Sequence, residues 1–450
     1  MRKHLVSGAI AALFVTGPGL EARANEADAY GLGSRAAALG GAVAADASDF
    51  SGNYYNPAAL VGAPGVSLSI GYIHVENNLR IDDHDNAVAP AHGIVGGLVA
   101  PGKLFGVPFA FGLGTYLPDA GLSRIKALRQ ETPRWALYDD RASIVFLAAN
   151  LAIRPLPWLD LGGGVAFLAA TQGRFAISGS ADIVHPFNSQ LTHEVDADLT
   201  SIRYPQVGAR IKVGDVGYLG VVYRGQTRLE LGINARLSGT VLAIPLRYEL
   251  ASHTIDAFLP QQIVLGASFQ KIRHLKVNLD LTFVNWAAYE SPTAQTRAHL
   301  ALDLPALMLP PDPKPIVVIA PAFANRFVPR VGVEYTLSAA GSVRRVHDED
   351  HRLVEIPLRM GYVFERSPVP PQTGVTNFVD ADRHTVSLGA GLVVNAPFAV
   401  FPGRLELDVH GQLSILPERV TRKDNPADFV GDYRAGGTML GLGSTLTAVF

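Results

Sequence analysis

The strongest constraint on the fold of this chain is an alternation of apolar and polar residues that recurs along most of its length. In residues 404–415 the odd positions carry mostly aliphatic side chains, and the even positions carry polar or charged ones. Side chains of a β-strand point to opposite faces with a period of two, so such a segment has one apolar and one polar face. Many strands of this kind predict a barrel whose outside faces lipid and whose inside faces water.

The first 24 residues have the layout of a signal peptide. Arg2, Lys3 and His4 are basic, residues 5–20 are largely apolar, and Ala22-Arg23-Ala24 fits a small-x-small cleavage site. We therefore expect export and a mature chain from Asn25, with a retained N-terminal anchor as the alternative. No other apolar run of about 20 residues is present, which argues against membrane-spanning helices.

The composition agrees with a β-rich membrane protein. Hydrophobic residues make up 48% of the chain, and the mean hydropathy is +0.19. The 45 glycines and 30 prolines suit a protein with many turns, and the absence of cysteine excludes a disulfide framework. A net charge of -2 gives no reason to expect a nucleic-acid partner.

The chain divides into an N-terminal part without alternation and a long part with it. Residues 25–63 are rich in small residues, and we interpret them as a compact hatch that fills the lumen of a barrel formed by residues 64–450. The count is fourteen antiparallel strands, at 66–79, 92–100, 108–117, 138–154, 158–177, 197–213, 216–232, 247–271, 274–287, 327–337, 352–366, 383–395, 403–416 and 433–450. Pro260 is interpreted as a bend within one long strand.

Connections between the expected strands alternate between short and long, as periplasmic turns and external loops do. The longest external loop, 288–326, is proline-rich and apolar. It would pack either on a hydrophobic ligand or on neighbouring loops. Residues 338–351 break the alternation, because they fall on the periplasmic side and are nevertheless long and charged.

Several motifs together resemble the FadL/TodX family of outer-membrane transporters for long-chain fatty acids and hydrophobic hydrocarbons. The N-terminal part resembles the family's hatch with its Asn-Pro-Ala motif, and a later tryptophan resembles its Trp-x-x-aromatic strand end. The matching segments are Gly33-Ser34-Arg35-Ala36, Asn53 to Leu60, Val222-Tyr223-Arg224, Leu259-Pro260-Gln261-Gln262, Asn285 to Tyr289, Arg359 to Pro370 and Asp380-Ala381-Asp382-Arg383. The Ser-Pro-Val-Pro and Asp-x-Asp-Arg pair is the most specific of these.

The resemblance implies passive transport by loop capture, a lumenal pocket beside the hatch and lateral release next to a kinked third strand. Gly112 and Gly114 lie in the expected third strand, where they would either permit a kink or pack against the hatch. Asn56, Pro57 and Ala58 are the candidate gating residues of the hatch, and a simple turn after Asn56 is the alternative.

A carboxylate ligand would be met by a lumenal arginine, because arginine gives the best charged hydrogen bonds to carboxylates. Arg174 is the first candidate, because the segment around it resembles a family segment that has a basic residue at the end of the same strand. Arg359 and Arg383 face the lumen by parity and are further candidates. Alternatively, these arginines form structural ion pairs with acids such as Glu334, Glu406 and Asp408, and a neutral hydrocarbon would need no cation.

No cofactor or metal is expected. The charged runs 82–85 and 347–351 are interpreted as solvated loops, and no G-x-S-x-G or similar spacing indicates an enzyme. A general porin and an outer-membrane lipid-modifying enzyme are the alternative functions. The expected partners are a hydrophobic substrate, outer-membrane lipids and lipopolysaccharide, and the barrel-assembly machinery through the C-terminal Phe450, with the protein as a monomer.

Overall fold

The computed structural model describes residues 26–450 of the 450-residue chain, apart from some internal segments. These segments are 86–87, 120–131, 136, 139–144, 181–189, 242–243, 290–294, 303–320, 339–342, 347–348, 353 and 398–402. The predicted signal peptide and most of the apolar stretch of loop 288–326 lie outside the described residues.

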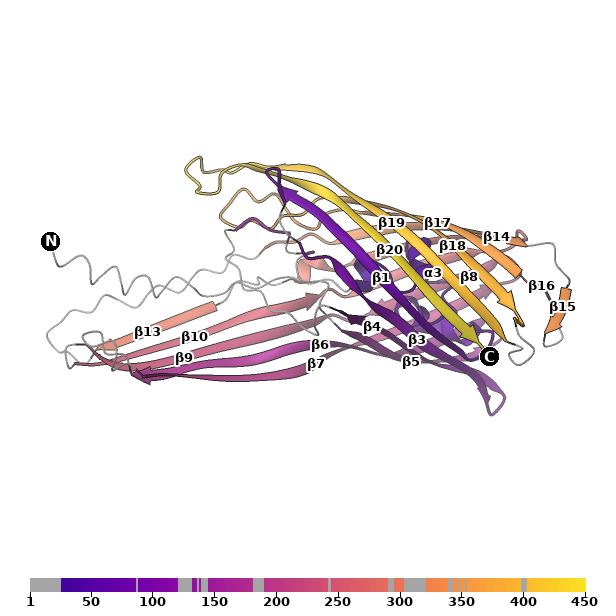
Figure 1. Cartoon of the computed structure of the whole chain (residues 1–450), viewed down its shortest axis with the longest axis horizontal. Coiled ribbons are helices and arrows are strands. Elements are labelled where there is room, and N and C mark those ends of the chain that lie inside the picture. The colour runs from indigo at the N-terminus through magenta and orange to yellow at the C-terminus, as the bar shows by residue number, and fades with distance from the viewer. Residues whose placement is uncertain are drawn as a thin grey trace.

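The main body of the protein is a closed antiparallel barrel (Figure 1). A 15-stranded sheet closes through the pairing of β1 with β3, and β2 (His84–Asp85) stands outside the closure, which leaves fourteen strands in the ring. In order around the ring they are β1 (Ser67–Ile81), β3 (Ala91–Leu104), β4 (Val107–Pro118), β5 (Phe146–Leu156), β6 (Leu159–Ser180), β7 (Gln190–Val213), β8 (Gly217–Arg224), β11 (Gln262–Phe269), β12 (Leu275–Val284), β14 (Arg326–Ser338), β17 (Val354–Glu365), β18 (Arg383–Asn395), β19 (Arg404–Thr421) and β20 (Tyr433–Val449). The predicted fourteen-stranded barrel is confirmed, and each expected strand has its counterpart in the ring.

Two hairpins continue beyond the ring at the end opposite the C-terminus (Figure 1). One is the long β6–β7 hairpin. The other extends β8 and β11 through β9 (Thr227–Val241) and β10 (Ile244–Leu259), which form a separate sheet with β13 (Gln295–Leu302). The expectation of one long strand 247–271 bent at Pro260 is therefore wrong, because β10 ends at Leu259 and only β11, after Pro260, belongs to the ring. The long charged connection after β14 contains a small hairpin of its own, β15 (Val343–Val346) with β16 (Glu349–Arg352).

Exposure confirms the predicted faces of the strands. In β19, Leu407 and Val409 point outward and are 43% and 46% exposed, whereas Asp408 and His410 point inward and are buried. The same alternation in the other ring strands gives the barrel an apolar outer surface, as a lipid environment requires. No helix among the described residues is both long enough and apolar enough to cross a membrane.

The N-terminal segment, defined here as residues 26–62, lies inside the ring and is almost entirely buried. It contains α2 (Glu26–Ala29), α3 (Ser34–Ala38), α4 (Gly52–Tyr55) and the 3-10 helix η1 (Pro57–Gly62). Gly31, Gly33, Gly40 and Gly41 have positive φ angles, so the chain turns sharply on both sides of α3. Asn56 caps η1 by accepting a hydrogen bond from the Ala58 N–H. Pro57 occupies the first helical position, where a backbone N–H would have no partner within the helix.

Candidate functional site

The N-terminal segment is attached to one part of the barrel wall by buried ion pairs. Arg35 of α3 pairs with Asp46 and also lies 3.4 Å from Glu334 of β14. Arg359 of β17 donates to Glu334 and to Asp408 of β19, each at 2.6 Å. We call these residues, together with Lys276 of β12, the charged attachment. Arg359 is therefore held between two carboxylates, as the structural alternative predicts.

The electrostatic environment of Asp46 is set by its cationic neighbours. Burial by itself would raise the pKa of this carboxyl, but Lys276 and Arg35 lower it, and the net pKa lies below the ordinary value. Asp46 is therefore ionised at neutral pH and acts as a permanent partner of Arg35.

Neutral amides join the N-terminal segment to the opposite part of the wall. Asn150 of β5 donates to both the backbone and the side-chain oxygen of Asn53, at 3.1 and 3.0 Å. Gln206 of β7 donates to Asn150 at 2.7 Å, and Asn56 donates to the backbone oxygens of Ala44 and Ala209. We call this group the amide attachment.

Glycines in the wall make room for the amide attachment. A Cβ added at Gly162 of β6 would lie 2.4 Å from the Ala58 nitrogen, and one at Gly208 of β7 would lie 2.1 Å from the Asn56 side chain. Gly112 of the third strand meets Asn53 at 2.4 Å in the same way, and Gly114 also faces Asn53. This geometry supports the interpretation in which Gly112 and Gly114 pack against the segment.

A cluster of aromatic rings covers the barrel where the strands of the ring end. It joins the end of β10 to three loops, and its ring centroids are spaced 4.9 to 6.4 Å apart. Its members are Phe258, Trp286, Tyr289, Phe323 and Phe378, all buried. The Trp-x-x-aromatic motif thus supplies two rings of this roof, and Phe323 of the long apolar loop packs on a neighbouring loop.

The Ser-Pro-Val-Pro and Asp-x-Asp-Arg motifs hold the loop between β17 and β18 against this roof. The Ser367 hydroxyl donates to Asp380, and its backbone N–H donates to Asp382. Arg419 of β19 donates to the Ser367 hydroxyl and to the backbone oxygen of Val369. The motifs therefore fix a loop that carries Phe378.

A small space, which we call the chamber, lies between this roof and the N-terminal segment. Its charged lining comprises Arg326, Arg330 and Arg383 with Asp28 and Glu365, so three cations face two acids. Arg383 pairs with Glu365 and donates to the Ala29 backbone oxygen, and Arg326 pairs with Glu365 at 3.0 Å. The predicted candidate Arg383 thus lines the chamber and is ion-paired.

Two further donors of the chamber have unused hydrogen-bonding capacity. Arg330 donates to the Thr282 hydroxyl at 2.6 Å, and no carboxylate of a described residue lies within ion-pair distance of its guanidinium. Trp286 is 1% exposed, and its indole N–H has no acceptor among the described residues. An enclosed space with donors of this kind fits an acceptor on a ligand.

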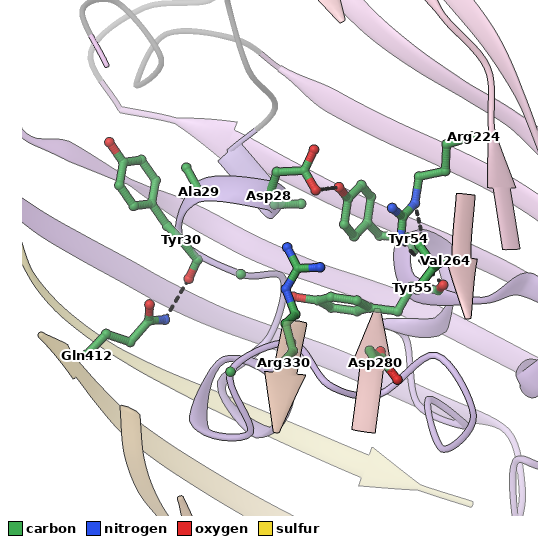
Figure 2. Close-up of a pocket in the computed structure, with 14 residues that line it drawn as sticks. Asp28, Ala29, Tyr30, Tyr54, Tyr55, Arg224, Val264, Asp280, Arg330 and Gln412 are labelled. Carbon is green, nitrogen blue, oxygen red and sulfur yellow. Dashed lines mark hydrogen bonds between the residues drawn. The ribbon is translucent and has the colours of Figure 1, made fainter. Parts of the chain in front are cut away.

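The N-terminal segment also lines a second small cavity (Figure 2). Asp28 and Arg330 line both spaces, and Figure 2 shows the Arg330 guanidinium directed into the cavity beside Tyr55. Burial raises the pKa of Tyr55 to about 12, so it is a neutral phenol. The cavity is therefore polar, with Arg330 at its junction with the chamber.

A small apolar pocket lies on the other side of the same stretch of the segment. Residues Ala27 to Leu32 separate it from the polar cavity, and Ile73, Val75, Tyr116 and Phe146 of the wall complete its lining. Polar and apolar spaces thus adjoin across a few residues, an arrangement suited to an amphipathic molecule.

The three arginines predicted to bind the ligand lie in three different parts of the structure. Arg383 reaches the chamber, Arg359 belongs to the charged attachment, and Arg174 lies in β6 opposite Asp196 of β7, where side chains are outside the described part. Arg330 and Trp286 are absent from the sequence-based candidates. Among the described residues, no group of three or more His, Asp or Glu side chains is arranged to hold a metal ion.

Comparisons with known proteins agree with this architecture. The sequence profile of a family described as outer membrane protein transport protein (OMPP1/FadL/TodX) matches residues 12–344. No curated protein sequence matches significantly. A crystal structure of a Pseudomonas aeruginosa FadL homologue is 17% identical, with 96% of this chain and 98% of that chain covered and a TM-score of 0.53. The CymD monoaromatic hydrocarbon channel is 15% identical over 93% and 97%, with a TM-score of 0.54. The P. putida toluene transporter TodX is 16% identical over 94% and 99%, with a TM-score of 0.50. These structural likenesses establish a shared fold.

Proposed function

Because this chain belongs to the OMPP1/FadL/TodX family of outer membrane transport proteins, and is thereby a bacterial outer-membrane transporter of hydrophobic compounds, we propose that it takes up long-chain fatty acids or hydrocarbons in three steps. External loops capture the molecule, the chamber and its neighbouring cavities bind it, and the molecule leaves sideways into the membrane. Each CH₂ kept out of water contributes about 0.8 kcal/mol, so this path suits an alkyl chain better than a water-filled pore does.

The observation that carries the proposal is the junction at Arg330. A carboxylate placed there would accept charged hydrogen bonds from a guanidinium that forms no ion pair with a described residue, and the Trp286 N–H offers a further donor. The alkyl chain of the same molecule would reach the apolar pocket beside Tyr116 and Phe146 only after residues Ala27 to Leu32, which separate the two spaces, move aside. This pairing favours a long-chain fatty acid over a neutral hydrocarbon, which would use the apolar pocket alone.

The proposal gives the N-terminal segment the role of a hatch, with residues 25–63 as its extent and residues 64–450 as the barrel. Its burial within the ring and its two attachments support closure of the lumen, which disfavours a general porin. Asn56, Pro57 and Ala58 are proposed as the gating residues, because they form the contact with Gly162 and Gly208 of the wall.

The remaining assignments follow from the same proposal. Transport is passive and includes no catalytic step. Membrane lipids and lipopolysaccharide contact the apolar outer surface, and the protein is a monomer. The barrel-assembly machinery recognises the C-terminal Phe450, whose 65% exposure supports this assignment.

Binding measurements with matched ligands test the proposal. Replacing Arg330 by Met should weaken the binding of hexadecanoic acid by about tenfold to a hundredfold, because a hydrogen bond to a charged group is lost. Binding of the neutral hexadecanol should stay unchanged, and the conservative Arg330→Lys variant should retain part of the affinity for the acid. Lys271→Met, on an exposed turn, serves as the control. Equal affinity of wild type and Arg330→Met for the acid would contradict the proposal.

A further inference from the structure

Arg330 stands between two spaces, and each of them offers one acceptor for its guanidinium. The side chain lines both the chamber and the polar cavity of Figure 2. Of the two acceptors, Thr282 lines the chamber and Asp280 lines the polar cavity. Both belong to β12, the strand that pairs with β14. The guanidinium can therefore be turned toward either space.

The register of the two strands places Asp280 directly opposite Arg330. Residues that face each other across an antiparallel pair have Cβ atoms about 4.5–5.5 Å apart, and opposite charges at such positions attract. Thr282 lies two residues further along β12, a step of about 7 Å. In the structure the guanidinium donates to this diagonal neighbour at 2.6 Å and forms no ion pair with Asp280 or another described residue. The acceptor directly opposite is left unused.

The Asp280 carboxyl is buried and only half used. Its Oδ2 accepts a hydrogen bond from the Ala44 N–H at 2.9 Å, and its Oδ1 has no hydrogen-bond partner among the described residues. Oδ1 lies against Gly266 of β11, where an added Cβ would be 2.7 Å away, so the carboxyl has to rotate to turn it toward β14. A buried carboxylate oxygen without a donor is costly, which makes Asp280 a strong attractor for a guanidinium within reach.

The other charged side chains of the polar cavity already have partners. Asp28 accepts from the Tyr54 hydroxyl and from Gln262, and Arg224 donates to Gln262 and to the Tyr54 backbone oxygen. Figure 2 shows the Arg330 guanidinium pointing away from Asp280. Asp280 and Arg330 are thus the two charged groups of this cavity that retain unused capacity among its described residues.

A ligand carboxylate at Arg330 and the Asp280 carboxylate would compete for one guanidinium. A bound acid favours the position of Arg330 at Thr282, because the ligand then supplies the anion. When the guanidinium turns to Asp280, the ligand loses its charged hydrogen bonds. A neutral hydrocarbon is indifferent to this exchange.

We propose that Arg330 alternates between two positions, one at Thr282 that binds the carboxylate of the ligand and one at Asp280 that gives it up. In this scheme Asp280 is a positioning residue, which acts on the ligand through Arg330 and sets how fast the acid is released. The inference rests on the proposed function and specifies how its head-group site is emptied.

Substitution of Asp280 by Asn tests the competition, because it removes the charge and keeps an acceptor for the Ala44 N–H. Binding of hexadecanoic acid to the purified protein should tighten about tenfold, through slower dissociation, and binding of hexadecanol should stay unchanged. Asp215→Asn removes the same charge from an exposed turn and should alter neither ligand. In an Arg330→Met background, Asp280→Asn should no longer change the affinity for the acid.

A second variant approaches the exchange from the other position. Thr282→Val removes the hydroxyl that holds Arg330 in the chamber, so the guanidinium should move to Asp280 and acid binding should weaken severalfold. Adding Asp280→Asn to this variant should restore the affinity.

Three results would overturn the inference and leave the proposed function standing. They are unchanged acid binding in Asp280→Asn, tightening that persists in the Arg330→Met background or extends to hexadecanol, and unchanged or tighter acid binding in Thr282→Val. Failure of the wild-type protein to bind the acid would contradict the proposed function itself.

Discussion

The N-terminal segment is held to the barrel in two different ways. The charged attachment uses ion pairs from Arg35 to Glu334 of β14 and from Asp46 to Lys276 of β12, and Arg359 of β17 links Glu334 to Asp408 of β19 within the wall. The amide attachment, centred on Asn53 and Asn56, uses neutral hydrogen bonds and close packing against glycines of β4, β6 and β7. The first depends on charge and the second depends on shape.

This difference determines which substitutions each attachment tolerates. Loss of one partner from a buried ion pair leaves an uncompensated charge and costs about 3–5 kcal/mol, whereas a neutral hydrogen bond contributes about 0.5–1.5 kcal/mol. The amide attachment has little tolerance for added volume, because backbone atoms of the segment lie directly over Gly162. The charged attachment should therefore respond most to charge removal, and the amide attachment to added methyl groups.

The largest effect is expected for Arg359→Leu. It removes the partner shared by Glu334 and Asp408 and should lower the free energy of unfolding by about 3–5 kcal/mol, measured by urea denaturation. Lys271→Leu, which removes an exposed ion pair with Asp215, should change it by less than about 1 kcal/mol. A loss of ligand affinity without a loss of stability would show that Arg359 is a ligand contact and would break the comparison.

An intermediate effect is expected for Gly162→Val. The added atoms would overlap Pro57 and Ala58, which should cost about 1–3 kcal/mol and loosen the segment. Steady current through planar bilayers is the measurement. Gly163→Val, on the outward face of the same strand, is the matched control and should conduct no more than wild type. Equal currents in both variants would show that the glycine contact does not hold the segment.

The smallest effect is expected from mild acid. The pKa of Asp46 is lowered in the docked segment, so its stabilising contribution is complete above about pH 4 and is lost as the pH falls through the docked pKa. Protease cleavage within residues 26–62 should therefore rise only below about pH 4, and Asp46→Asn should reduce this dependence. Cleavage that rises between pH 7 and pH 5 would point to another titrating group.

The fold could be predicted from the sequence because the alternation that indicates each strand can be seen within a few neighbouring residues. Alternation alone located all fourteen ring strands and the outward faces of Leu407 and Val409, and a lack of alternation set residues 25–63 apart. The same parity placed Arg359 and Arg383 inside the barrel, where both are buried.

Which inward-facing arginine is left for the ligand depends on the pairing of strands that are distant in the sequence, so the proposed binding residues were harder to predict. Arg330 and Arg359 both face inward, and only the register of β12, β14, β17 and β19 gives Arg359 two acids and leaves Arg330 with Thr282. Trp286 was noted as a motif, yet its orphan N–H follows from loop packing. Pro329 within a strand was the available signal for the point where the ladder between β14 and β17 stops.

The central claim is that the N-terminal segment closes the barrel, and conductance tests it most directly. Intact protein in planar bilayers should pass no steady current, whereas protein lacking residues 26–62 should form an open pore with steady conductance. Identical conductance of the two proteins, with the shortened one folded by its circular dichroism spectrum, would contradict the claim.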